Sequence, residues 1–194
     1  MSKYNEVERE LMEKMKGAVV PVVAIKNIEK VYALEQYLVD NKIKFCEITY
    51  RTDCASEAIE YMSKNENIIV GAGTILTLEQ AKDAVDSGAK FLVSPAINLE
   101  VMDYAISVNI PIIVGVETAS EVLLATSRGV SFVKLFPANI AGGVGKLKAF
   151  ESVFKGVKFM PTGGVNKDNY MDYLNQKNVV CVGGTFVIPK EILE

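Results

Sequence analysis

The sequence predicts an α/β fold, specifically a (β/α)8 barrel. Eight apolar segments begin about 20 to 26 residues apart, the spacing of a strand, a loop and one covering helix. Helix start and stop signals lie between them, and no linker of domain size interrupts the alternation. A doubly wound open sheet is the main alternative. The expected strands are Ala18–Ile25, Lys44–Tyr50, Asn67–Thr74, Lys90–Ala96, Ile110–Glu117, Ser131–Pro137, Val157–Val165 and Val179–Phe186.

Helices are expected before the first strand and between the strands. Glu6–Met15 predicts an extra helix that closes the floor of the barrel. The first covering helix carries apolar residues at helical spacing, which are Ile28, Val31, Leu34 and Leu38. Little chain follows the eighth strand before Glu194, so the last helix is expected to be short or missing.

Several residues mark the ends of the expected helices. Thr77 with Gln80, and Thr118 with Glu121, have the spacing of capping boxes. Asn166 is expected to cap the seventh helix. Gly88 and Gly129 follow two other helices, at the position where a left-handed residue commonly ends a helix.

The bulk composition bounds the class of protein. A chain of 194 residues with 49% hydrophobic residues predicts a single barrel domain over residues 1–194. The net charge of −3, with no long basic run, argues against a nucleic-acid partner. The sequence contains no 18-residue apolar run and its first 16 residues are too charged for a signal peptide, so we expect no membrane partner and a cytoplasmic location.

The chain contains no histidine, which excludes histidine bases, Ser-His-Asp triads and histidine-ligated metals. Its three cysteines form no CxxC pair, so neither a zinc site nor a disulfide framework is expected. We therefore expect no metal and no cofactor. Proton transfer has to be carried out by Glu, Asp, Lys, Tyr or Cys.

Lys134 lies alone in an apolar segment that reads as a buried strand. Burial of an ammonium group favours the neutral amine, and a neutral lysine is a nucleophile for carbonyl carbons. Lys134 is therefore a candidate for Schiff-base chemistry. The alternative is a lysine that reaches from a strand end to water or to a carboxylate.

The alternation of side chains along a strand predicts a partner for this lysine. In the second strand, Glu47, Thr49 and Arg51 share one face, while the opposite face is apolar and should meet the outer helices. In the sixth strand, Lys134 shares a face with Phe132 and Phe136. Glu47 and Lys134 are thus expected to meet inside the barrel, as catalytic groups or as a structural ion pair.

Glycine pairs end the last two strands, Gly163-Gly164 in one and Gly183-Gly184 in the other. Such turns present backbone N–H groups to an anion, and barrels often bind phosphate after strands seven and eight. We therefore expect a phosphate site here. Thr74, after the third strand, either holds a substrate oxygen or caps the next helix, and Pro95 ends the fourth strand.

Taken together, these motifs resemble the KDPG/KHG aldolase family, the class I aldolases of 2-keto-3-deoxy-6-phosphogluconate (KDPG) and 4-hydroxy-2-oxoglutarate (KHG). The matching motifs cover nearly the whole chain in family order. They are Glu47–Thr52, Val70–Thr74, Ser94-Pro95, Lys134–Ala138, Pro161–Val165 and Val182–Thr185.

The resemblance implies a role for each matching residue. Lys134 matches the Schiff-base lysine and Glu47 the general acid/base. Around the carboxylate end of the substrate, Arg51 and Thr74 match binding residues and Pro95 lines the site, while Phe136 packs beside the lysine. The phosphate end is matched by Gly163, Gly164, Gly184 and Thr185, where the family commonly has serine in place of Thr185. The resemblance also implies a homotrimer.

The function expected from the sequence is metal-independent, reversible cleavage of KDPG to pyruvate and glyceraldehyde 3-phosphate. Two alternatives keep the chemistry and change the substrate, to KHG or to 2-keto-3-deoxy-6-phosphogalactonate. A third is a barrel that binds sugar phosphates without catalysis. A metal-dependent epimerase is disfavoured by the absence of histidine.

Overall fold

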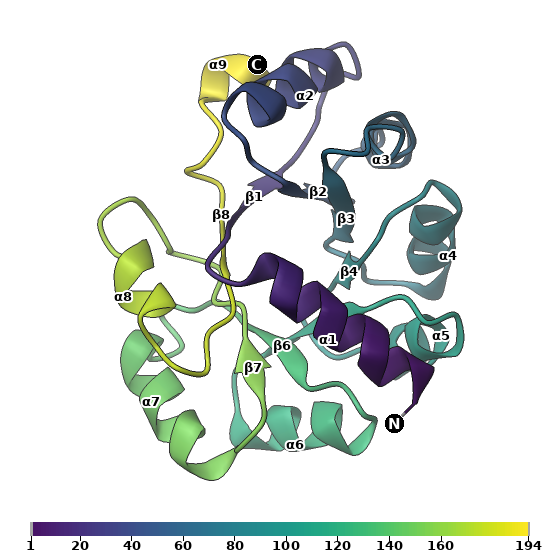
Figure 1. Ribbon diagram of the computed structural model, residues 1–194. Helices are drawn as coiled ribbons and strands as arrows, with labels where there is room; N and C mark the ends of the chain where they lie inside the picture. The colour runs from purple at the N-terminus through teal and green to yellow at the C-terminus, as the bar shows by residue number, and fades with distance from the viewer. Residues whose placement is uncertain (1, 194) are drawn as a thin grey trace.

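The computed structural model describes residues 2–193 and has the expected α/β barrel fold (Figure 1). Its eight strands pair in parallel in the order β7-β6-β5-β4-β3-β2-β1-β8. Bridges between Phe159 and Val179 and between Thr162 and Gly183 join the two ends of this order. The open-sheet alternative is therefore wrong. The strands are β1 Val19–Val23, β2 Phe45–Thr49, β3 Ile69–Gly73, β4 Leu92–Val93, β5 Ile112–Val116, β6 Phe132–Leu135, β7 Lys158–Phe159 and β8 Val182–Gly184.

All eight expected segments contain a strand, but each strand is shorter than its apolar segment. β4 and β7 keep only two residues each. After β4 the chain turns at once, and the Ser94 hydroxyl donates to the carbonyl of Ala96. Apolar residues at the strand ends therefore belong to loops that are buried at the barrel mouth, which hydrophobicity alone does not separate from strands.

Helices alternate with the strands and surround them (Figure 1). α1 is the extra helix, and α9 is the short last helix, which packs against α2. None of the helices within residues 2–193 has the length and apolar character needed to cross a bilayer. The helices are α1 Lys3–Met15, α2 Lys30–Asp40, α3 Ala55–Met62, α4 Leu78–Asp86, α5 Leu99–Ser107, α6 Ala119–Ser127, α7 Gly143–Val153, α8 Tyr170–Leu174 and α9 Lys190–Leu193.

The helix ends follow the sequence signals with one exception. Complete capping boxes begin α4 and α6, and Gly88 and Gly129 have the positive φ angles expected of them. The prediction that Asn166 caps the seventh covering helix is wrong. Asn166 accepts a hydrogen bond from the N–H of Asp168 in a preceding turn, and α8 begins only at Tyr170.

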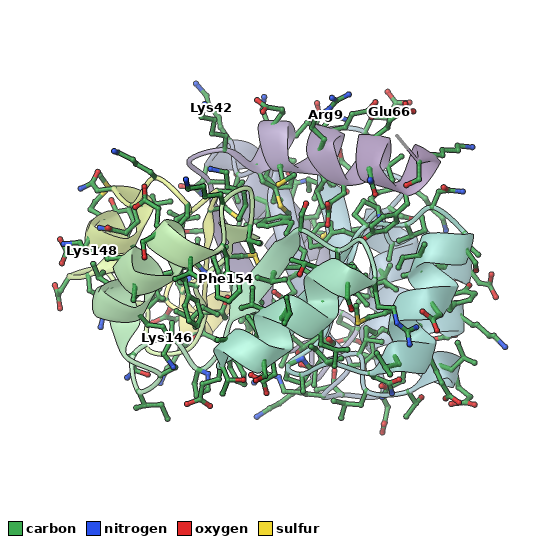
Figure 2. All side chains as sticks on the ribbon, turned by 90° about the horizontal axis from the view of Figure 1, so that it is seen from below. Arg9, Lys42, Glu66, Lys146, Lys148 and Phe154 are labelled. Carbon is green, nitrogen blue, oxygen red and sulfur yellow. The ribbon has the colours of Figure 1, made fainter. Side chains whose placement is uncertain are left out.

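The core has two parts, one inside the barrel and one between the strands and the outer helices. Phe91 and Phe132 fill the interior, together with Leu11 and Met15 of α1. α1 lies across one end of the barrel, and Arg9 points away from it (Figure 2). The apolar face of α1 thus closes the floor, and the opposite end holds the loops that follow the strands.

Two buried side chains of α1 form hydrogen bonds with the starts of β5 and β6. The Glu8 carboxylate is 2% exposed and accepts hydrogen bonds from the N–H groups of Ser131 and Phe132 and from the Ser131 hydroxyl. The Tyr4 hydroxyl accepts one from the N–H of Ile112. These bonds satisfy backbone donors at the starts of β5 and β6, which would be costly to leave buried and unpaired.

Candidate active site

Lys134 is the third residue of β6 and points into the barrel. Its neighbours Val133 and Leu135 belong to the outer core, as the alternation predicts, while Phe132 lies inside. Lys134 is 5% exposed, and its Nζ lies 3.6 Å from the Oε1 of Glu47. It also lies 5.1 Å from the centre of the Phe136 ring. This amine is nearly removed from water and faces one carboxylate and one aromatic ring.

Glu47, in the middle of β2, is fully buried. Within residues 2–193, neither of its carboxylate oxygens accepts a hydrogen bond from the protein. A buried carboxyl group normally has several such partners, whereas within residues 2–193 the one basic group at ion-pair distance from Glu47 is Lys134. Its oxygens remain available to a ligand or a water in the cavity, which is the arrangement a general acid/base requires.

Glycines in β3 and β5 leave space for Glu47 and for two other residues near the site. A Cβ on Gly73 would overlap the Glu47 carboxylate, and a Cβ on Gly71 would overlap the ring of Phe91. A Cβ on Gly115 would overlap the carbonyl of Pro95. The position of the Glu47 carboxylate therefore depends on the absence of a side chain at Gly73 of the neighbouring strand.

Arg51 and Thr74 lie at the mouth of the barrel, at the ends of β2 and β3. The Arg51 Nε donates to the Thr49 hydroxyl, which in turn donates to the carbonyl of Val23. Thr74 has a φ of 57°, a conformation that a β-branched residue rarely adopts. Such strain persists when the surrounding fold holds the residue in place, and it is common at ligand sites.

Gly163 and Gly164 follow β7 with φ angles of 92° and 76°. Within residues 2–193, the backbone N–H groups of Gly163, Gly164 and Val165 have no protein partner. Consecutive free N–H groups in such a turn form a concavity that suits an anion. Thr185 follows Gly184 of β8 and is exposed next to this turn.

A single cavity of about 250 Å³ brings these residues together at the carboxyl ends of the strands. All ten residues that the sequence indicates for the site line this cavity. Three further residues line it that the sequence does not indicate, namely Val22, Thr162 and Val165. Thr162 lies within the segment Pro161–Val165 that ends the seventh expected strand, and its side chain packs against Gly183. The ten selected residues are Glu47, Arg51, Thr74, Pro95, Lys134, Phe136, Gly163, Gly164, Gly184 and Thr185.

The buried thiols near Glu47 are poor candidates for proton transfer. Burial raises the pKa of Cys46 and of Cys181 well above the usual range, and the charge of Glu47 adds to this effect. Both thiols therefore stay protonated at neutral pH. In the part of the chain described, no three acidic or cysteine side chains gather as a set of metal ligands.

The family model "Aldolase: KDPG and KHG aldolase" matches residues 10–194. The KHG/KDPG aldolase of Escherichia coli (strain K12) is 39% identical over 179 residues, which cover 92% of this chain and 84% of that one. The 2-dehydro-3-deoxy-phosphogluconate aldolase of Pseudomonas aeruginosa is 37% identical over 177 residues, covering 91% and 80%.

Solved structures agree with these sequence relatives. A KDPG aldolase from Legionella pneumophila, with pyruvate captured as a covalent carbinolamine intermediate, has a TM-score of 0.89 at 37% identity and covers 99% of this chain and 91% of that one. The Zymomonas mobilis enzyme with 3-phosphoglycerate has a TM-score of 0.89 at 35% identity, covering 94% and 88%.

Proposed function

The chain belongs to the KDPG and KHG aldolase family, and on that basis we propose that it cleaves KDPG reversibly to pyruvate and glyceraldehyde 3-phosphate. The observation that carries the proposal is the pair of Lys134 and Glu47 inside the cavity. The Nζ of Lys134 lies 3.6 Å from the Oε1 of Glu47, and both side chains are buried. The proposed mechanism is that of a class I aldolase, in which the electrophile is an iminium ion and no metal is required.

The reaction begins when the neutral amine of Lys134 attacks the C2 carbonyl of the keto acid. A new C–N bond forms, the carbonyl electrons move to oxygen, and a proton transfer gives the carbinolamine. Glu47, as a carboxylic acid, then protonates the departing hydroxyl, and water leaves to give the iminium ion. The distance between the two side chains allows Glu47 to reach groups attached to the lysine nitrogen.

Glu47 then acts as a base, directly or through a water. It takes the proton of the C4 hydroxyl while the C3–C4 bond breaks, and the electron pair of that bond moves into the iminium ion to give an enamine. Glyceraldehyde 3-phosphate leaves. Protonation of the enamine carbon restores the iminium ion, and water hydrolyses it to release pyruvate and the free amine. One residue thus donates and accepts protons in turn.

The other residues of the cavity hold the two ends of the substrate in this proposal. The guanidinium of Arg51 and the hydroxyl of Thr74 bind the carboxylate, Pro95 lines that side, and Phe136 limits the space around the lysine. At the other end, the phosphate binds to the glycine turn. Anchoring both ends aims C2 at the amine and raises the effective concentration of the reactants. The phosphate end consists of Gly163, Gly164, Gly184 and Thr185.

Two solved relatives support the proposed intermediate and the proposed class of ligand. In the Legionella pneumophila enzyme pyruvate is held as a covalent carbinolamine, which is the intermediate proposed for Lys134. The Zymomonas mobilis enzyme was solved with 3-phosphoglycerate, a three-carbon acid that carries a phosphate. Both ligands belong to chemical classes that this cavity suits.

The first experiment is to incubate the protein with pyruvate and sodium borohydride and to map any added mass by peptide mass spectrometry. We expect a reduced pyruvyl adduct on Lys134 that is absent in Lys134→Ala. Absence of the adduct in a folded protein would overturn the Schiff-base mechanism and favour a non-catalytic barrel that binds sugar phosphates. Cleavage rates with KDPG, KHG and 2-keto-3-deoxy-6-phosphogalactonate identify the substrate, and undiminished turnover in EDTA checks the absence of a metal requirement.

We also propose that the protein is a homotrimer in the cytoplasm, as the family resemblance implies. Leu123 and Leu124 on α6 are 64% and 40% exposed, an apolar surface that a neighbouring subunit would cover. Light scattering measures the mass of the particle, and cell fractionation its location. A monomeric particle would contradict the first proposal.

A further inference from the structure

A second cavity, of about 580 Å³, lies beside the catalytic one at the same end of the barrel. We call it the outer chamber. It shares Val22, Arg51 and Thr185 with the catalytic cavity, and its wall continues with Lys26, Asn27 and Lys190. The loop after β1 and the segment leading into α9 thus form a space that adjoins the catalytic cavity along its edge.

The charge of the outer chamber is positive. Three of the residues that line it are cationic, namely Lys26, Arg51 and Lys190, and no lining residue is acidic. Within residues 2–193, none of these three cations lies within ion-pair distance of a carboxylate. Unpaired cations gathered in a concave space create a potential that attracts anions.

In the loop after β1, the carboxylate of Glu29 is turned to a partner other than the lysines of the chamber. The Oε2 of Glu29 accepts a hydrogen bond from the side-chain amide of Asn27, at a distance of 3.4 Å. The backbone N–H of Glu29 itself donates to the Asn27 side chain. These contacts hold the loop after β1 in one shape and keep Glu29 engaged with Asn27 rather than with a lysine.

The free donors of the chamber suit a phosphate group. Arg51 uses its Nε to hold Thr49, which leaves its terminal nitrogens free, and a guanidinium can bind a phosphate through two hydrogen bonds. The backbone N–H groups of Lys26 and Thr185 have no partner in the described chain. A phosphate monoester carries more negative charge at neutral pH than a carboxylate and gains more from three cations.

We propose that the outer chamber is a second anion-binding site, which takes the phosphate group of a phosphate monoester or a free phosphate ion before the catalytic cavity is entered. The identity of the monoester as a substrate rests on the proposed aldolase function, whereas the binding of phosphate does not. Because Arg51 and Thr185 line both spaces, an anion held in the chamber lies next to the substrate site. Its release into that site requires no separate entry path.

The test compares the wild type with a Lys26→Ala/Lys190→Ala variant, in which two exposed lysines of the chamber are removed. The matched control is Lys148→Ala/Lys155→Ala, which removes the same charge from two exposed lysines. Lys148 lies on α7 (Figure 2), and Lys155 follows that helix in the sequence. Binding of inorganic phosphate and of glycerol 3-phosphate is measured by calorimetry at an ionic strength of about 0.01 M, where charges act over about 30 Å. We expect the Kd of both probes to rise about fivefold to tenfold in the chamber variant and not in the control.

Kinetics identify the source of the anion. If it is the phosphate of the substrate, the KM for KDPG rises in the chamber variant while kcat stays within about twofold. If it is free phosphate, added inorganic phosphate raises the KM of the wild type more than that of the chamber variant. Equal Kd and KM values in the two double variants would overturn the proposal that the outer chamber binds anions. A wild type that forms no pyruvate adduct would instead overturn the aldolase function. The binding measurements would still test whether the outer chamber binds phosphate.

Discussion

The carboxylate of Glu47 occupies the space that a side chain on Gly73 would fill. The two residues lie on the neighbouring strands β2 and β3, where Thr49 pairs with Gly73 and Glu47 pairs with Gly71. The position of the proposed acid/base is therefore set by a residue that contributes no functional group. Any side chain at position 73 has to displace the carboxylate from its place beside Lys134.

Substitution Gly73→Ala tests this dependence directly. We expect a large loss of kcat, because Glu47 can no longer stand beside Lys134, and some loss of stability from overpacking, about 1 to 3 kcal/mol. The matched control is Gly145→Ala in α7, where an added Cβ would meet no atom within 4 Å. That variant should keep its activity and gain stability of about 0.5 to 1 kcal/mol. Full activity in Gly73→Ala would show that Glu47 tolerates another position.

Glu47→Gln separates proton transfer from imine formation. General acid–base catalysis typically contributes about 10²- to 10⁴-fold, and we expect turnover to fall within that range. Some borohydride-trapped pyruvate adduct should still form on Lys134, because the nucleophile is retained. The measurement pairs steady-state cleavage with the trapping rate. Normal turnover in this variant would remove Glu47 from the mechanism.

Thr74 allows strain and binding to be separated. Its φ of 57° costs free energy in a threonine, whereas glycine adopts this conformation without steric penalty. Thr74→Gly should therefore lose little or no thermal stability while its KM for the keto acid rises through loss of the hydroxyl. Thr74→Ser keeps the hydroxyl and should keep a KM close to that of the wild type. A Thr74→Gly variant with an unchanged KM would argue against carboxylate binding by this side chain.

The interior of the barrel could be predicted from the sequence because alternation along a strand is a strict geometric rule. It placed Glu47 and Lys134 on inward faces, and the structure brings them together. The α4 and α6 capping boxes were likewise predictable, because each depends on residues three positions apart. The prediction for Asn166 was wrong because an Asn side chain can also accept a hydrogen bond within its own loop. Here it accepts one from the N–H of Asp168.

Other features depend on contacts between distant segments, which no local pattern contains. The clearance that Gly73 provides for Glu47 is a cross-strand contact, and Val22 lines the catalytic cavity only because β1 lies between β2 and β8. The outer chamber combines residues from positions 22 and 193, at nearly opposite ends of the chain. Residues such as Lys26 and Lys190 look like ordinary surface lysines until the barrel brings them together.

The thiols provide a test of the barrel interior in solution. Burial raises the pKa of Cys46 and Cys181, so they contain almost no thiolate near pH 8, whereas Cys54 is only partly buried. Iodoacetamide should therefore label Cys54 first, and the other two only after denaturation. Peptide mass spectrometry over a time course measures each site. Rapid labelling of Cys181 in the native protein would show that the interior is open to solvent.

Glu121 links stability to acid pH. Its pKa is lowered overall, because the upward effect of partial burial is outweighed by hydrogen bonds from the N–H groups of Glu117 and Thr118 and from the Thr118 hydroxyl. A carboxylate whose pKa is depressed in the folded state contributes stability above its unfolded pKa, about 4.3, and loses it as the pH falls through the folded value.

Glu121→Gln should therefore lower the Tm at pH 7, and the difference from the wild type should shrink as the pH falls below about 4. Glutamine can still complete the capping box, as Gln80 does at the start of α4, so the helix itself should persist. The matched control is Gln80→Glu, which introduces a carboxylate into the capping box of α4. The Tm of this variant should exceed that of the wild type at pH 7, and the difference should shrink as the pH falls. Melting curves measured between about pH 3 and about pH 7 distinguish these outcomes. A Tm difference for Glu121→Gln that does not change with pH would show that the carboxylate charge adds nothing to the cap.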